Sequence, residues 1–137
     1  MGRILALDVG DVRIGLAVSD PMGIIANPLE TYQRQTLKKD LEYICGICKN
    51  REAALIICGL PKKLNDTDSL QTVKVREFAD ALSKIAEVPV KLFDERLTTA
   101  AAERVLLEGN VRRSDRKQVI DKVAATIILQ NYLDSVR

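Results

Sequence analysis

The sequence contains no histidine and no tryptophan, and its 137 residues include only three tyrosines and two phenylalanines. Without an imidazole, the chain cannot use a Ser-His-Asp triad, a Cys-His pair or a histidine-ligated zinc ion. So few aromatic side chains also argue against a platform that stacks many bases. No apolar run approaches the roughly 20 residues that a membrane-spanning helix needs. These absences exclude several catalytic classes, and we expect no membrane association.

The composition that remains is typical of a globular domain, with 47% hydrophobic and 29% charged residues. This length predicts a single domain, residues 1–137, whose core needs no disulfide or metal to fold. Asp8 and Asp11 interrupt the apolar stretch that a secretory signal would need, so we expect a cytoplasmic protein. The net charge of +2 does not by itself indicate a nucleic-acid partner, but it permits one if the basic residues cluster.

The three cysteines, Cys45, Cys48 and Cys58, allow redox chemistry or metal binding in principle. Cys45 and Cys48 have the CxxC spacing of a redox pair. They also fall with Leu41 and Ile44 on the apolar stripe of a predicted helix, where cysteine behaves as a small buried hydrophobic residue. We therefore expect a packing role for both cysteines. Two further ligands for a zinc–thiolate site are not evident in the sequence.

Hydrophobic periodicity and turn residues predict elements in the order βββαβαβαα. Residues 4–7 form a continuous apolar run, which is typical of a strand covered on both faces. Strands over 14–19 and 24–32 follow, and Pro28 favours a sheet edge for the third. The other predicted elements are a helix capped by Thr36 that runs to about 50, a strand over 53–58, a helix from after Asp68 to about 86, a strand over 88–93, a helix from Thr98 or Thr99 that ends before Gly109, and a helix over about 115–135.

These elements predict an α/β fold. Three strands with short links predict an antiparallel meander, and the two crossover units after it predict a mixed five-stranded sheet flanked by helices. We expect the parallel strands 4–7, 53–58 and 88–93 to be central, with ligands bound beyond their C-terminal ends. The faces of the first two helices that we expect to point inward carry Leu37, Leu41, Ile44, Cys45 and Cys48 in one helix, and Val75, Phe78, Ala79, Leu82 and Ile85 in the other.

Acidic residues occur at the ends of these strands. Asp8 ends the first strand, and Asp94 and Glu95 end the fifth. Asp121 lies in the first turns of the last helix, and its neighbours at i+3, i+4, i+7 and i+11 are Ala124, Ala125, Ile128 and Tyr132. This apolar pattern predicts that Asp121 lies on the buried face, where an unpaired carboxylate is costly. Three converging carboxylates suit Mg²⁺ or Mn²⁺ and phosphoryl chemistry, although each acid alone could be a turn residue or a helix-dipole partner.

Basic residues near these acids could bind phosphates. Arg13 lies in the turn after Asp8, and a predicted basic linker over 112–117, just before the last helix, carries Arg112, Arg113, Arg116 and Lys117. By charge alone, a solvated loop is the simpler interpretation. Beside a metal site, contacts with a nucleic-acid backbone become the better interpretation, and recognition would then depend on shape and backbone more than on base stacking.

Four segments, LALDVGDVRIGLAVSD, GLPKKLNDTDS, FDERLTT and DKVAATIILQNYLD, together resemble the YqgF/RuvX family of pre-16S rRNA nucleases and Holliday-junction-resolvase-like proteins. They occur in the family's order and span residues 5–134. The resemblance implies an RNase H-like fold. It also implies that Asp8, Glu95 and Asp121 are catalytic and bind the metal ions, with Asp94 as the competitor for the second position.

The resemblance also implies contacts with the substrate. Arg96, Thr98 and Thr99 belong to the same segment as Glu95 and would orient it or touch the substrate. Lys62 and Lys63 would contact phosphates, although Asn65-Asp66-Thr67 departs from the family's pattern, in which glycine often follows the Asn or Asp.

The first functional hypothesis is a Mg²⁺- or Mn²⁺-dependent nuclease that acts on the 5′ end of precursor 16S rRNA. A four-way DNA junction is the alternative substrate. A non-catalytic RNA-binding factor for ribosome assembly would keep the basic residues but need no acids. An ATPase of the actin and sugar-kinase type would share the turn after Asp8 but needs two such domains. We expect a monomer or a homodimer.

Overall fold

The computed structural model describes residues 2–60, 70–94 and 113–136 of the chain, and for residues 113–122 only the course of the helix. The strands are β1 (Arg3–Val9), β2 (Arg13–Ser19), β3 (Ala26–Gln33), β4 (Ala53–Leu60) and β5 (Val90–Asp94). The helices are α1 (Leu37–Asn50), α2 (Leu70–Ile85) and α4 (Arg113–Ser135). The helix predicted from Thr98 or Thr99 lies outside the described residues, as does Asp68.

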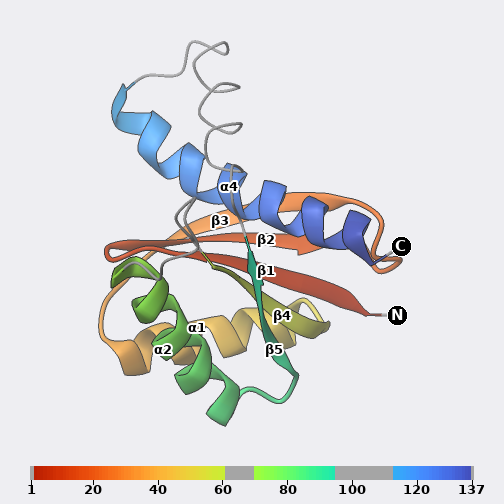
Figure 1. Ribbon diagram of the computed structural model, residues 1–137, viewed down its shortest axis with the longest axis horizontal. Coiled ribbons are helices and arrows are strands. Elements are labelled where there is room, and N and C mark those ends of the chain that lie inside the picture. The colour runs from red at the N-terminus through yellow and green to blue at the C-terminus, as the bar shows by residue number, and fades with distance from the viewer. Residues whose placement is uncertain (1, 61–69, 95–112, 137) are drawn as a thin grey trace.

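The five strands form one mixed sheet in the order β3-β2-β1-β4-β5. β1, β2 and β3 pair antiparallel, which confirms the predicted meander, and β4 pairs parallel with both β1 and β5. β3 is an edge strand, as Pro28 predicted, because proline cannot donate to a neighbouring strand. α1 and α2 cover one face of the sheet, and α4 crosses the other (Figure 1).

β1 is buried on both faces because a helix layer covers each. Leu5 and Leu7 belong to the core beneath α1 and α2, whereas Ile4 and Ala6 pack with residues of α4, namely Ala125, Ile128, Leu129 and Leu133. This double burial explains the continuous apolar run in the sequence. It also shows that the even-numbered residues of β1 face α4, which determines the side on which Asp8 lies.

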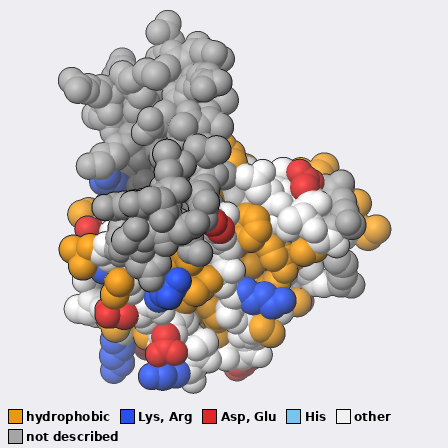
Figure 2. Space-filling model, viewed as in Figure 1, with side chains coloured by type: hydrophobic (Ala, Val, Ile, Leu, Met, Phe, Trp, Pro, Cys, Tyr) orange, Lys and Arg blue, Asp and Glu red, His pale blue; other side chains and the backbone are white. Residues whose placement is uncertain are grey.

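The prediction that all three parallel strands are central is wrong for β5, which forms the second edge of the sheet. Apolar side chains reach the surface on the face seen in Figure 2, and Leu92 of β5 is 42% exposed. The apolar pattern of residues 88–93 indicates that the segment packs on a core. It carries no information on how many strands pair with the segment.

The predicted basic linker over 112–117 is also wrong wherever the structure describes it. α4 begins at Arg113, so Arg113, Arg116 and Lys117 are helical, and the helix starts two residues before the predicted Asp115. Arginine, lysine and glutamine are strong helix formers, and a dense run of charge does not break a helix. Arg112 lies outside the described residues.

Thr36 caps α1 as predicted, because its hydroxyl accepts a hydrogen bond from the backbone N–H of Lys39 at 3.2 Å. Leu37 and Ile85, which we expected to point inward, are instead 50% and 51% exposed. Each is the terminal residue of its helix, beyond the turns that pack on the sheet. Among the described helices, none is both long and apolar enough to span a membrane.

Candidate functional site

Asp8 is half-buried near the C-terminal end of β1, on the face of the sheet that α4 covers. Its partner on β2 is Gly15. On the other side, Gly59 of β4 lies one position beyond the last β1–β4 pair. Neither glycine has a side chain, so the residue directly beside Asp8 on each neighbouring strand places no side chain next to its carboxylate.

Arg13, the first residue of β2, lies on the same face of the sheet as Asp8 and closer to the β1–β2 turn. It stands two residues before Gly15, the partner of Asp8 on β2, and the side chains of a strand return to the same face every two residues. Diagonal neighbours of this kind are about 7–8 Å apart between α-carbons. A cationic and an anionic side chain therefore share this corner of the sheet.

Helix and strand geometry predicts that position 121 of α4 lies level with Asp8. Gln130 accepts a hydrogen bond from the backbone N–H of Ala26 at 3.0 Å, and Ala26 is level, across β2, with Ile4 of β1. Asp8 lies four residues further along β1, about 13 Å away. Because α4 runs antiparallel to β1 (Figure 1), nine residues back from Gln130, about 13.5 Å, lead to position 121.

The inward face of α4 is the one that the sequence predicted. Ala124, Ala125 and Ile128 are buried, and Tyr132 packs edge-on against Phe93 with 5.6 Å between the ring centroids. Position 121 continues the same row toward the N-terminus of the helix by its spacing. The side chain of Asp121 lies outside the described part of the chain, so its inward orientation stays a prediction.

Asp94 ends β5 on the opposite face of the sheet. Phe93 packs toward α4, whereas Asp94 is paired with Leu60, a member of the core beneath α1 and α2. Successive residues of a strand point to opposite faces, so the exposed Asp94 points away from the face of Asp8. Glu95, the next residue, lies outside the described residues.

The structure tests few of the other predicted site residues. Arg113, Arg116 and Lys117 lie on the first turns of α4, N-terminal to Asp121, with only their backbone described. The predicted residues outside the described part are Lys62, Lys63, Glu95, Arg96, Thr98, Thr99 and Arg112. Where side chains are described, no three of histidine, cysteine, aspartate or glutamate form a group that could hold a metal. The set of Asp8, Glu95 and Asp121 therefore stays a prediction.

The turn that joins β1 to β2 begins two residues after Asp8, at Gly10, and is held by three parts of the chain. The Gly10 N–H donates to the Arg13 carbonyl at 2.8 Å, and a Cβ at residue 10 would lie only 2.8 Å from that oxygen, so glycine is required. Gln71 of α2 donates from Nε2 to the Val9 carbonyl, and Arg34 donates from Nη1 to the Gly10 carbonyl, each at 2.9 Å.

The sequence did not predict a role at this turn for Arg34, Gln71 or Asp40, the partner of Arg34. Asp40 could have been found, because it precedes Leu41 and lies four residues before Ile44 on the apolar face of a predicted helix. That is the same pattern that singled out Asp121. Arg34 and Gln71 give no such pattern, because their partners at the turn are backbone carbonyls.

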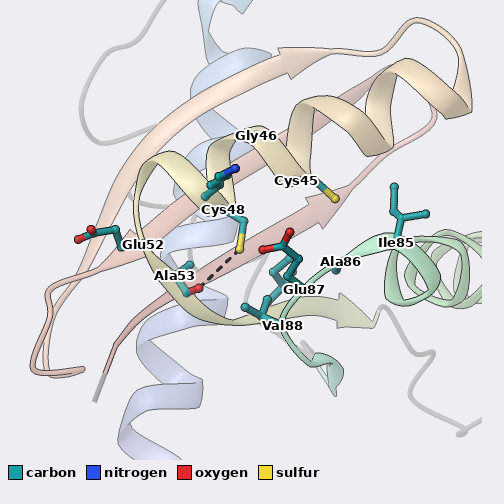
Figure 3. A pocket seen from close by; sticks show the side chains of 11 residues that line it. Cys45, Gly46, Cys48, Glu52, Ala53, Ile85, Ala86, Glu87 and Val88 are labelled. Atoms are coloured by element: carbon teal, nitrogen blue, oxygen red, sulfur yellow. Dashed lines mark hydrogen bonds between the residues drawn. The ribbon is translucent and has the colours of Figure 1, made fainter.

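A pocket of about 280 Å³ lies at the other end of the sheet, against the first residue of β4 and the loop before β5 (Figure 3). Cys45 and Cys48 line it together with Glu87. Burial raises the pKa of both thiols, and the nearby Glu87 carboxylate raises it further. Cys48 also donates a hydrogen bond to the Ala53 carbonyl at 3.7 Å. Protonated thiols of this kind support a packing role over a redox pair.

We expect the three thiols to react in the order of their exposure. Cys45 is half-buried and should react first with a disulfide reagent such as DTNB, followed by the buried Cys48. Cys58 should react only on unfolding, because complete burial raises its pKa to about 12. Released thionitrobenzoate, followed in buffer and in urea, measures these rates. Rapid, reversible formation of a Cys45–Cys48 disulfide would contradict the packing role.

Relatives of the chain match it along nearly its whole length. Residues 2–135 match the family model described as RuvX, Holliday junction resolvase. A Clostridium novyi (strain NT) protein named "Putative pre-16S rRNA nuclease" is 50% identical over 134 residues, 98% of this chain and 99% of the relative. Proteins of the same name from Clostridium botulinum (strain Hall) and Clostridium kluyveri are 49% and 44% identical, each over 98% of both chains.

Solved structures share the fold at much lower identity. RuvC of T. thermophilus in complex with a Holliday junction substrate superposes with a TM-score of 0.63 at 14% identity, over 99% of this chain and 96% of that one. Fowlpox virus resolvase in complex with Holliday junction DNA gives 0.58 at 10% identity, over 98% of each chain. These neighbours confirm the predicted RNase H-like fold. The family match and the relatives at 44–50% identity show that the chain belongs to the RuvX Holliday junction resolvase family.

Proposed function

We propose that the chain is a nuclease that hydrolyses phosphodiester bonds in precursor 16S rRNA, during maturation of its 5′ end, with Mg²⁺ or Mn²⁺ as cofactor. The observation that carries the proposal is the position of Asp8, a half-buried carboxylate near the C-terminal end of β1 with a glycine beside it on β2. Ligands of open α/β sheets bind at this end of the strands. The name of the Clostridium relatives supports the choice of substrate.

A hard divalent cation fits the donor set at this end of the sheet. Carboxylate oxygens are the ligands that Mg²⁺ and Mn²⁺ prefer, and the chain has no histidine to compete with them. Asp8 would hold the cation together with Glu95 and Asp121, and the level of position 121 with Asp8 supports this set. When bound, such a cation activates water and offsets the charge of the reacting phosphate.

The chain's own basic residues would orient the substrate. Arg13 shares the face of Asp8, so its guanidinium would hold a phosphate next to the one that reacts, through charge-assisted hydrogen bonds. Further from the reacting bond, the sugar-phosphate backbone of the nucleic acid would contact polar and basic residues of α4 and of other segments. These residues are Lys62, Lys63, Arg96, Thr98, Arg112, Arg113, Arg116 and Lys117. Contacts of this kind position a strand without reading its sequence.

The alternation of β5 supports Glu95 over Asp94 as the second carboxylate. Phe93 packs on the face of Asp8 and α4, and Asp94 points to the other face. By the same alternation, the side chain of the residue after Asp94 would point to the face of Phe93. We therefore propose that Glu95 holds the cation with Asp8, and that Asp94 does not.

The pair Glu95→Gln and Asp94→Asn tests this assignment with two neighbouring residues of the same charge. We expect Glu95→Gln to lower the rate of metal-dependent cleavage roughly 100-fold or more, because a ligand is lost. Asp94→Asn should stay within about twofold of wild type, as is usual for an exposed residue away from the site. Single-turnover rates with Mg²⁺ measure both. The reverse order of effects would assign the role to Asp94.

The substrate can be identified by running two nucleic acids side by side. Wild-type protein would be incubated with a precursor 16S rRNA 5′ fragment and with a four-way DNA junction, in Mg²⁺, in Mn²⁺ and with chelator. Cleavage of the RNA that disappears with chelator is the expected result. Cleavage of the junction alone would favour the DNA resolvase. Binding of the RNA without cleavage of either substrate would favour a non-catalytic assembly factor.

The remaining parts of the proposal follow from this activity. Precursor ribosomal RNA is processed in the bacterial cytoplasm, where we propose that the protein acts. We propose that residues 1–137 form a single RNase H-like domain. Either a monomer or a homodimer is compatible with one such site per chain, and sedimentation velocity with and without the RNA fragment distinguishes them.

A further inference from the structure

We infer that Arg34 is a positioning residue of the proposed site, and that Asp40 orients it. This inference rests on the proposed function, because it concerns the turn that follows Asp8. Arg34 connects the start of α1, where Asp40 lies six residues further on, with the β1–β2 turn, where Gly10 lies 24 residues back. Its backbone N–H donates to the Val12 carbonyl at 2.9 Å, its Nη1 donates to the Gly10 carbonyl at 2.9 Å, and its Nε donates to Asp40 at 2.9 Å.

The guanidinium of Arg34 has little freedom to move. Only 21% of its side chain is exposed, and its Cζ lies 5.2 Å from the centroid of the Phe78 ring. It is therefore held by a carboxylate, by a carbonyl and by an aromatic face. A lysine could not reproduce these contacts, because its ammonium group is not planar and cannot form two directed hydrogen bonds along a fixed fork.

Asp40 explains why the guanidinium holds this direction. Its side chain is 1% exposed and accepts hydrogen bonds from the Tyr32 hydroxyl, the Arg34 Nε and the Gln35 N–H, each at 2.9 Å. Burial raises its pKa, but the hydrogen bonds from Gln35, Arg34 and Tyr32 outweigh that effect and hold the pKa below its usual value. The carboxylate thus stays charged at neutral pH and fixed in place.

These contacts form a rigid connection from α1 to the turn. Asp40 is anchored in α1, Arg34 follows β3, and Gly10 lies two residues after Asp8 in the chain. Stability alone does not account for such a pair, because a buried ion pair often contributes no more stability than apolar residues of the same size. The ion pair does fix the direction in which the Arg34 guanidinium points. Such a constraint matters for catalysis because small displacements of a reacting group have large effects on rate.

The test compares a variant that removes the contact with Gly10 against one that weakens the same buried cluster but keeps that contact. In the double variant Arg34→Gln/Asp40→Asn, both charges are replaced by amides, so no buried charge is left unpaired. In Tyr32→Phe, only the hydroxyl that donates to Asp40 is lost. Both variants should lower the melting temperature, which controls for a general loss of stability.

Two readouts separate positioning from stability. The first is cleavage kinetics, in which we expect kcat of the double variant to fall roughly 10- to 100-fold with little change in KM, and Tyr32→Phe to keep the wild-type kcat. The second is amide hydrogen exchange of Gly10, whose N–H donates to Arg13, and which should be faster in the double variant alone. A double variant with wild-type kcat and wild-type exchange at Gly10 would overturn the inference.

The exchange measurement needs no substrate, so it distinguishes the failure of this inference from the failure of the proposed function. If wild-type protein cleaves neither nucleic acid, the proposed function fails. Exchange at Gly10 then still decides whether Arg34 holds the turn. If wild-type protein cleaves and kcat falls equally in both variants, Arg34 acts through stability, and the positioning role is wrong.

Discussion

Asp8→Asn should abolish metal-dependent cleavage, with a fall in rate of about 10³-fold or more. The amide keeps the size of the side chain but removes the negative charge that would hold the cation, which is worth several kcal/mol in the transition state. The change should leave the fold intact, because asparagine is nearly isosteric with aspartate. Circular dichroism and single-turnover cleavage of the RNA fragment measure the two effects.

Asp11→Asn is the matched control for this experiment. Asp11 lies three residues further, in the turn itself, and its 60% exposed side chain pairs with Lys74 at 3.1 Å. A surface pair of this kind contributes about 1 kcal/mol or less, and Asp11 is not part of the proposed site. Cleavage should therefore be close to wild type. If Asp8→Asn and Asp11→Asn cleave equally well, the carboxylate mechanism is wrong and the RNA-binding factor becomes the better hypothesis.

The parts of the fold that could be predicted depend on local patterns. Four features could each be predicted from a single segment of sequence and its solvent exposure. They are the buried strand β1, the edge position of β3 with its proline, the helix cap at Thr36 and the buried row of α4. Each prediction was confirmed. The inward orientation of Asp121 extends the buried row of α4 by the same helical spacing, and it stays a prediction.

Features that depend on several segments at once could not be predicted. The edge position of β5 depends on which strands pair with it, and five residues of strand do not encode that. The contact of Arg34 with the Gly10 carbonyl joins residues 24 positions apart, and one partner is backbone, which has no sequence signature. Site geometry of this kind is accessible only once the fold is known.

Asp40→Ala should lower the free energy of unfolding by about 3–5 kcal/mol, because it leaves the Arg34 guanidinium and the Tyr32 hydroxyl buried without their acceptor. That loss is a large part of the roughly 5–15 kcal/mol that stabilises a typical domain, and it should lower the melting temperature by about 10 °C or more. Asp80→Asn is the matched control. Its exposed pair with Lys84, at 3.4 Å, should contribute about 1 kcal/mol or less.

The pH dependence of this effect identifies the charge of Asp40 as its cause. The folded-state pKa of Asp40 is lowered, so its contribution is fully present above the unfolded value, near 3.8, and is lost as pH falls through the lower folded value. The difference in unfolding free energy between wild type and Asp40→Ala should therefore be constant from about pH 7 to pH 5 and shrink below about pH 4. Urea titrations across this range measure it. A difference that grows in acid would mean that the carboxyl group is protonated in the folded protein, and Asp40 could not then hold Arg34 as an ion pair.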